Sequence, residues 1–399
     1  MFGVILGALF ALMHWYLWKR LVKDTTRPGR VRRAATVATV LLALLVFATL
    51  TLGREVDPDI GQWFAWPGYV WFALLFYMFL ITLLLELPRL ALRGWVRRRP
   101  LEATAATATS PPPAPVADPG PVANPGRRLF LARGAGLVAG VASASLVGSG
   151  LVSALGAPDL LRVKVPLRRL DPSLAGFRIA VVSDIHLSAL LRRSHTERIV
   201  RMINESSPDL VAIVGDLADG TVADLGDAAA PLADLVSREG SFFVTGNHEY
   251  FVDPDGWVRE LERLGVHTLR NEHTTITRGA ASFDLAGVTD VNGRSHDDAP
   301  DFDRALAGRS AGPVVLMAHQ PVQVSESAER GVDLQLSGHT HGGQLYPFHY
   351  VVAAAQPSLA GLSKVDDTYL YVTRGAGSWG PPVRVGAPPD ITLIELTTG

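Results

Sequence analysis

The stretch Gly338-His339-Thr340-His341-Gly342-Gly343 directly follows a short apolar run, Val332 to Leu336. In extended backbone, side chains two residues apart point to the same side, so both imidazoles can reach one small volume. The flanking glycines have no Cβ atom and allow other backbone to approach closely. A single His-x-His pair is weak evidence for a site, so its meaning depends on what the rest of the chain places beside it.

Four more polar clusters lie upstream, and each stands at the end of an apolar run of strand-like length. They are Asp184-Ile185-His186, Gly215-Asp216, Gly246-Asn247-His248-Glu249 and Ala318-His319-Gln320-Pro321. Amphipathic stretches with helical spacing separate the runs: Thr196 to Glu205, Ala223 to Arg238, Asp255 to Leu264 and Val322 to Arg330. This alternation predicts an α/β domain. The closer spacing of the later runs predicts two mixed sheets packed face to face, with helices outside.

The residue types in these clusters predict a metal centre. In α/β sheets, ligands bind beyond the carboxyl ends of the strands, where all five clusters fall. Carboxylate, imidazole and amide oxygen suit Mn, Fe, Zn or a similar divalent ion. The chain has no cysteine, so thiolate ligands and disulfides are excluded. The candidate ligands are too many for one tetrahedral ion and suffice for two ions that share a carboxylate: Asp184, His186, Asp216, Asn247, His319, His339 and His341.

The order of the clusters resembles that of the calcineurin-like metallophosphoesterases, over about residues 178–345. Two later segments, Arg374-Gly375-Ala376-Gly377 and Pro381-Pro382-Val383-Arg384, resemble the tail of the membrane-anchored bacterial branch. The resemblance implies a β-sandwich flanked by helices (α/β/β/α), which agrees with the pattern of strands and helices. It also implies a dimetal hydrolase of phosphate esters, with phosphodiesters expected, that uses metal-activated water.

The resemblance further implies individual roles. Asp184, His186, Asp216 and His341 match the ligands of the first metal. Asp216, Asn247, His319 and His339 match those of the second, with Asp216 as the bridge. His248 matches the catalytic histidine. Gln320 departs from the family pattern, where Asn is frequent. Four neighbours are expected either to orient the ligands or to cap loops: Asp219, Glu249, Asp290 and Gln344.

The first 155 residues have a different composition. Residues 1–100 are expected to form a membrane region with three transmembrane helices, at Phe2 to Trp18, Ala34 to Leu52 and Pro67 to Leu85. Residues 101–126 are expected to form a Pro/Ala-rich linker. Residues 127–156 are expected to be a fourth transmembrane helix, and residues 157–399 the metallophosphoesterase domain. Arg127-Arg128 resembles a twin-arginine export signal, and an ordinary positive anchor is the alternative.

Loop charges predict the orientation in the cytoplasmic membrane. Lys19 to Arg33 carries seven basic residues against one acid, and Pro88 to Arg128 carries seven arginines. Basic loops stay in the cytoplasm, so the chain is expected to be multi-pass with its catalytic domain on the extracytoplasmic side.

The partners follow from charge and from the membrane region. A net charge of −1 gives no sign of nucleic-acid binding, and the oligomeric state is not indicated. Only Gly156 to Asp159 separate the fourth span from the first strand, and basic residues crowd that region: Arg162, Lys164, Arg168 and Arg169. A phosphorylated lipid or lipid-linked envelope precursor is therefore one expected substrate, and a soluble phosphodiester or nucleotide is the other. A non-catalytic membrane sensor or scaffold is the alternative to an enzyme, although the intact ligand set argues against it.

Overall fold

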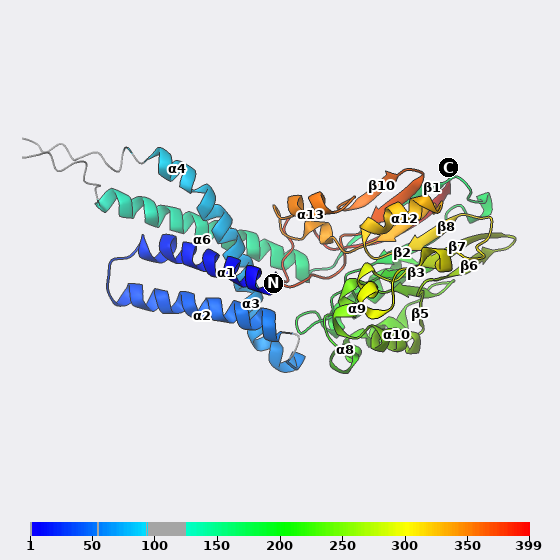
Figure 1. The fold of residues 1–399 in the computed structure, drawn as a ribbon, viewed down its shortest axis with the longest axis horizontal. Coiled ribbons are helices and arrows are strands. Elements are labelled where there is room, and N and C mark those ends of the chain that lie inside the picture. Colours follow the sequence, from blue (N-terminus) through cyan, green and yellow to red (C-terminus); the bar gives the residue numbers. More distant parts are fainter. Residues whose placement is uncertain (1, 54–55, 93, 95–124) are drawn as a thin grey trace, which may run out of the picture. The chain divides into compact units, whose positions relative to one another are not determined.

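The computed structural model describes residues 2–53, 56–92, 94 and 125–399. The expected linker falls almost entirely outside these residues, since positions 101–124 are not among them. The chain forms two compact units (Figure 1): Met1–Ala48 with Trp71–Val147, and Thr49–Val70 with Gly148–Gly399. The second unit contains all five polar clusters.

Long apolar helices dominate the N-terminal part of the chain. They are α1 (Phe2–Leu17), α2 (Arg30–Leu52), α3 (Pro58–Leu84) and α6 (Pro125–Leu155), with a π-helical turn at Trp18–Lys23 and the short α4 (Glu86–Ala91). Within the described chain, three helical stretches are long and apolar enough to cross a membrane: Arg30–Leu52, Pro58–Ala91 and Gly126–Leu155. With 16 residues, α1 is shorter than the roughly 20 that a bilayer core requires. A fourth span at the N-terminus therefore stays a prediction.

The first unit holds its helices together by apolar and ionic contacts. Met13 and Leu17 of α1 pack on Leu75 of α3. Arg20 forms ion pairs with Asp24 at 3.1 Å and with Glu86 at 2.8 Å. Several large apolar side chains on α2 are exposed: Val37, Val40, Leu41, Leu44 and Phe47 are each more than half exposed. Such a surface is typical of a helix that faces lipid.

Two six-stranded sheets form the core of the second unit. The first has the order β1 (Asp159–Leu167), β12 (Asp390–Thr398), β2 (Arg178–Val182), β3 (Leu210–Val214), β4 (Ser241–Val244), β5 (Val266–Thr268). The second has the order β10 (Gly361–Val365), β11 (Thr368–Val372), β9 (Leu334–Ser337), β8 (Val314–Met317), β7 (Ala281–Gly287), β6 (Glu272–Arg278). Strands β2 to β5 run parallel to one another, as do β7, β8, β9 and β11.

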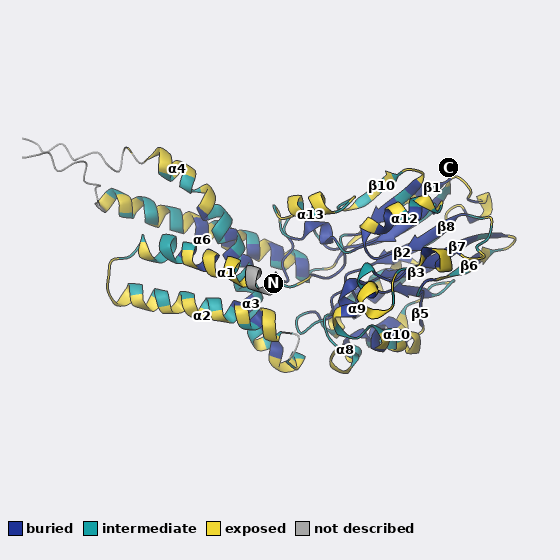
Figure 2. Ribbon diagram, viewed as in Figure 1, coloured by how far each residue is buried: buried dark blue, intermediate teal, exposed yellow. Residues whose placement is uncertain are grey.

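The two sheets pack face to face over an apolar core. On β2, Ile179 and Val181 point into the inter-sheet core, while Ala180 and Val182 point to the helices on the other face. These central strands are buried on both faces and accordingly read as continuous apolar runs. Figure 2 shows the strands in the colour of buried residues.

Helices cover the outer faces of both sheets. The first sheet packs on α7 (Arg193–Ser206), α8 (Val222–Ala229) and α10 (Pro254–Arg263). The second packs on α11 (Phe302–Ala305) and α12 (Val324–Glu329). Two further helices, α9 (Asn247–Val252) and α13 (His349–Ala355), follow β4 and the last histidine cluster. The predicted α/β/β/α sandwich with helices outside is confirmed. The helix expected at Ala223 to Arg238 is shorter, because α8 gives way to a 3₁₀ turn at Ala230–Asp234.

Candidate metal centre

Five parallel strands deliver the polar clusters to one place. Asp184 and His186 follow β2, Asp216 follows β3, and Asn247 and His248 open α9 after β4. His319 follows β8, while His339 and His341 follow β9. All of these side chains are buried except that of His339, which is partly exposed. The structure therefore brings together every residue that the sequence proposed for the site.

The first group of ligand-type atoms surrounds Nε2 of His186. It lies 3.1 Å from Nε2 of His341 and 3.9 Å from a carboxylate oxygen of Asp184. Nε2 of His341 is itself 3.3 Å from that Asp184 oxygen. Oδ2 of Asp216 lies 3.9 Å from Nε2 of His186, on the side of the second group.

The second group lies around Nε2 of His319. This nitrogen is 3.2 Å from Oδ2 of Asp216 and 3.2 Å from Oδ1 of Asn247. The same Asn247 oxygen lies 2.8 Å from Nδ1 of His339. Asp216 Oδ2 thus reaches both groups, as a bridging ligand must.

The geometry and the donor chemistry fit two divalent cations. Two atoms bound to one ion at about 2.1 Å lie about 3.0–3.5 Å apart when the bond angles are near 90–110°. Most of the distances above fall in or near this range. Carboxylates, imidazoles and one amide oxygen are also ligands that Mn, Fe and Zn accept. His248 belongs to a further compact group with His186 and Asp216, so proximity alone does not separate it from the ligands.

The backbone at the site is strained in a way that the sequence did not reveal. Five candidate ligands have left-handed backbone, with φ of 52° at Asp184, 50° at His186, 52° at Asp216, 71° at His339 and 52° at His341. Non-glycine residues adopt this region at a cost of about 1 kcal/mol or more each, and such residues cluster at functional sites. The left-handed backbone lowers the stability of the fold and turns these side chains toward one another.

Glycines allow the loops to approach one another. A Cβ atom on Gly246 would lie 2.2 Å from Oδ1 of Asp216, and one on Gly338 would lie 2.3 Å from Oδ2 of Asp184. Neither neighbour can retreat, because both are candidate ligands. These two positions of the motifs therefore require glycine for space.

Asp219 connects the two groups to His248. Its Oδ1 accepts from Nδ1 of His186 at 3.0 Å and from Nδ1 of His248 at 2.5 Å. A carboxylate only accepts, so both Nδ1 atoms carry protons, and each Nε2 is the ring nitrogen on the side of the metal centre. Burial opposes the charge on Asp219, but the two imidazoles outweigh burial and hold the pKa of Asp219 well below its usual range. Asp219 thus orients a candidate ligand and the candidate catalytic residue at once.

Glu249 organises the loops after β3 and β4. It accepts backbone N–H groups from Gly246 at 2.6 Å, Asp216 at 3.0 Å and Leu217 at 2.8 Å. Burial and the nearby charge of Asp216 raise the pKa of Glu249 to about 7, against the effect of these N–H donors. Of the two expectations for this residue, orientation of the site is the one that its contacts match.

Asp290 and Gln344 also bond within the site. Gln320 donates to both oxygens of Asp290, at 3.1 and 2.9 Å, so the departure from Asn holds this buried carboxylate. Gln344 donates to the backbone carbonyl of Trp379 at 2.9 Å and accepts its N–H at 3.1 Å. It thereby fastens the loop after His341 to the C-terminal segment.

Arg384 is a residue of the site whose role the sequence reasoning missed. It is 2% exposed and donates to the backbone carbonyls of His341 and Arg374 at 2.7 and 2.9 Å. Its Nη2 lies 3.1 Å from Nδ1 of His341. Burial and this cation hold the pKa of His341 well below its usual range, so the imidazole stays uncharged, as a metal ligand must. An arginine in a Pro/Val-rich stretch gives no sign of such a role.

The comparisons with known proteins agree with this geometry. Residues 177–343 match the family model described as calcineurin-like phosphoesterase. A "transmembrane protein with metallophosphoesterase domain" from Danio rerio is 34% identical, over 99% of this chain and 89% of its own. This chain is a calcineurin-like metallophosphoesterase. It is accordingly a metal-dependent hydrolase of phosphoric esters, and the family implies divalent metals.

Two further matches of this metallophosphoesterase cover less of its chain. An "uncharacterized metallophosphoesterase" from Helicobacter pylori is 38% identical, over 62% of this chain and 66% of its own. A dimetal phosphatase from Danio rerio is similar in structure at a TM-score of 0.31 and 12% identity, covering 52% of this chain and 90% of its own. Vertebrate and bacterial chains both occur among the relatives, so a specifically bacterial branch stays a prediction.

Proposed function

We propose that this metallophosphoesterase is a multi-pass membrane enzyme that hydrolyses phosphodiesters at the centre formed by the five loops. The observation that carries the proposal is the pair of ligand groups that share Asp216, with His248 at their edge. Asp184, His186, Asp216 and His341 would hold one divalent ion. Asp216, Asn247, His319 and His339 would hold the other. Mn, Fe and Zn all suit this donor set.

Two bound cations would supply positive charge to the phosphoryl oxygens and acidify a water molecule. In hydrolysis a bond forms between the water oxygen and phosphorus, the ester P–O bond breaks, and the leaving alcohol takes a proton. We assign that proton transfer to Nε2 of His248. Because Asp219 accepts the proton of Nδ1, Nε2 is the atom left to exchange a proton, and the Asp219 carboxylate stabilises the imidazolium.

The test is hydrolysis of an aryl phosphodiester by the full-length protein in detergent, reconstituted in turn with Mn, Fe and Zn. Turnover is expected with at least one metal and is expected to stop with a chelator. In ¹⁸O-labelled water, one labelled oxygen is expected on the phosphoryl product. A trapped phosphoenzyme would contradict attack by water, and two bound metals without any turnover would favour the scaffold alternative.

We further propose that the catalytic domain lies on the extracytoplasmic side of the cytoplasmic membrane. Loop charges and Arg127-Arg128 support this orientation, and relatives named as transmembrane proteins support a membrane location. A reporter fused after Gly399 is expected to be active when it requires export. Activity of a cytoplasm-specific reporter at the same position would reverse the orientation.

We also propose that the substrate is borne by the membrane. The short connection between α6 and β1 supports this proposal. Arg198 donates to the carbonyls of Leu155 and Gly156 at 2.8 and 2.9 Å, and Arg384 N–H donates to Gly150 at 2.9 Å. The last turns of α6 are thus fixed to the catalytic domain. Three of the four basic residues near β1 lend no support, since they pair with carboxylates: Lys164 with Glu395, Arg168 with Asp367 and Arg169 with Asp333.

A further inference from the structure

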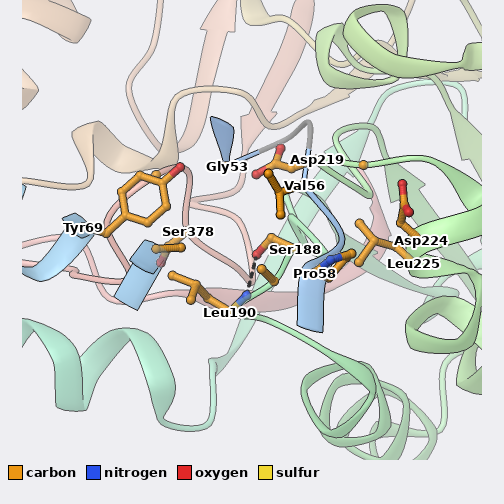
Figure 3. Close-up of a pocket in the computed structure, with 14 residues that line it drawn as sticks. Gly53, Val56, Pro58, Tyr69, Ser188, Leu190, Asp219, Asp224, Leu225 and Ser378 are labelled. Carbon is orange, nitrogen blue, oxygen red and sulfur yellow. Dashed lines mark hydrogen bonds between the residues drawn. The ribbon is translucent and has the colours of Figure 1, made fainter. Parts of the chain in front are cut away.

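A small cavity lies beside the metal centre, within the same compact unit (Figure 3). It has a volume of about 40 Å³. Ser188 and Leu190 line it from the loop after β2, Asp219 from the loop after β3, and Ser378 from the C-terminal segment. Val56 lines it from the segment that joins α2 to α3, and Tyr69 lines it from α3 itself. Asp219, which holds His248, is therefore shared between this cavity and the metal centre.

The cavity carries polar groups whose hydrogen-bonding capacity is unused. Ser378 is 5% exposed, and its Oγ has no hydrogen-bond partner among the described residues. A buried hydroxyl without a partner is costly, so it points to a ligand or to water. Asp219 bonds His186 and His248 through Oδ1, and within the described chain nothing bonds its Oδ2.

Ser188 adds a donor to this set. Its Oγ accepts the N–H groups of Leu190 and Leu191 at 3.4 and 3.3 Å, which leaves the hydroxyl proton to donate. Donors and an acceptor therefore face one small volume. An alcohol, which donates and accepts through the same oxygen, matches such a lining.

We infer that this cavity is a leaving-group subsite that takes the hydroxylated end of a glycerol group esterified to phosphorus. The inference rests on the proposed phosphodiesterase function. About 10–15 Å³ of such volume holds one water-sized group, so the cavity of about 40 Å³ admits roughly three, enough for the terminal hydroxymethyl group and the neighbouring hydroxyl of a glycerol ester. Because Asp219 reaches both the cavity and His248, a group bound there lies next to the residue that protonates the leaving oxygen.

The side of the cavity lined by Val56 and Tyr69 indicates that its ligand comes from the membrane surface or from nearby solution. Val56 lies between two candidate membrane spans, and Tyr69 lies within the second of them. An ion pair between Asp59 and Arg192 at 2.5 Å ties the first turn of α3 to the catalytic domain. The subsite therefore opens next to chain that enters the bilayer. Glycerol esters of phosphate occur both as lipid headgroups and as free diesters, and the experiment separates these sources.

The experiment compares kcat/KM for three substrates, measured on the full-length, Mn-loaded protein in nanodiscs. They are phosphatidylglycerol in the disc, a soluble glycerol phosphodiester, and an aryl methyl phosphodiester without hydroxyls. Ser378→Leu fills the cavity and is expected to lower kcat/KM for the glycerol esters about tenfold, equivalent to about 1.4 kcal/mol. The aryl ester should change less than about twofold. Ser378→Ala, the matched control, removes one hydrogen bond and should cost about threefold on the glycerol esters alone.

Ala189→Leu, which fills the cavity from the loop after β2, repeats the test if Ser378→Leu does not fold. Faster turnover of phosphatidylglycerol than of the soluble ester identifies the lipid headgroup as the source, and the reverse identifies free diesters. If a folded, cavity-filling variant slows all three substrates equally or leaves all three unchanged, the subsite is wrong while the proposed function stands. If the wild-type protein hydrolyses none of them, the proposed function itself fails.

Discussion

Asp216→Asn is expected to abolish phosphodiester hydrolysis and to reduce the metal content of the purified protein. Asp216 Oδ2 lies 3.2 Å from Nε2 of His319 and 3.9 Å from Nε2 of His186, so it is the carboxylate oxygen common to both groups. An amide of the same shape removes the negative charge that would balance two cations. We expect kcat/KM to fall by about 10³-fold or more, equivalent to about 4 kcal/mol of transition-state stabilisation.

The measurement pairs elemental analysis of bound metal with initial rates, on protein that near-UV circular dichroism shows to be folded. Asp227→Asn is the matched control, since Asp227 is an exposed carboxylate on α8 away from the centre. It should keep wild-type metal content and rate. Full metal occupancy and wild-type turnover in Asp216→Asn would show that Asp216 does not bridge the two cations.

His248→Asn is expected to lower kcat by about 10²–10³-fold, within the range found for general acid–base groups. Metal content should stay that of the wild type. The reason is that each proposed ion keeps four candidate ligands without His248, whose Nδ1 is bound to Asp219 at 2.5 Å. The substituted protein should therefore lose proton transfer and keep its ligands.

His267→Asn is the matched control for this variant. His267 lies on the edge strand β5, largely exposed, beside Glu262. Its substitution should leave rate and metal content unchanged. His248 lies close to His186 and Asp216, so it could also bind a metal ion. Loss of a metal ion from His248→Asn would show that His248 is itself a ligand.

The sequence predicted the central strands and the site because both are recorded in short patterns. Strands β2, β3, β8 and β9 are buried on both faces, so each reads as an unbroken apolar run. Within each sheet, the polar residues just beyond these runs come together because parallel strands end at the same edge. The face-to-face packing of the two sheets then brings His339, after β9, beside Asp184, after β2.

The edge strand β1 was predicted, whereas the edge strands β5, β6 and β10 and the supporting contacts were not. In β6, one residue of seven, Ile276, is buried, so periodicity gives little signal at that edge. The left-handed backbone of Asp184 or Asp216 has no sequence signature outside glycine and asparagine. The burial of Arg384 and the packing of residues 49–70 on the catalytic domain depend on contacts between distant segments, which local patterns do not record.

The most direct test of the two-cation centre is anomalous diffraction from crystals of the Mn-loaded full-length protein. Two anomalous peaks are expected, within about 4 Å of each other as in other two-metal sites. One should lie among Asp184, His186 and His341, the other among Asn247, His319 and His339, with Asp216 in contact with both. A single peak, or peaks away from these side chains, would contradict the account.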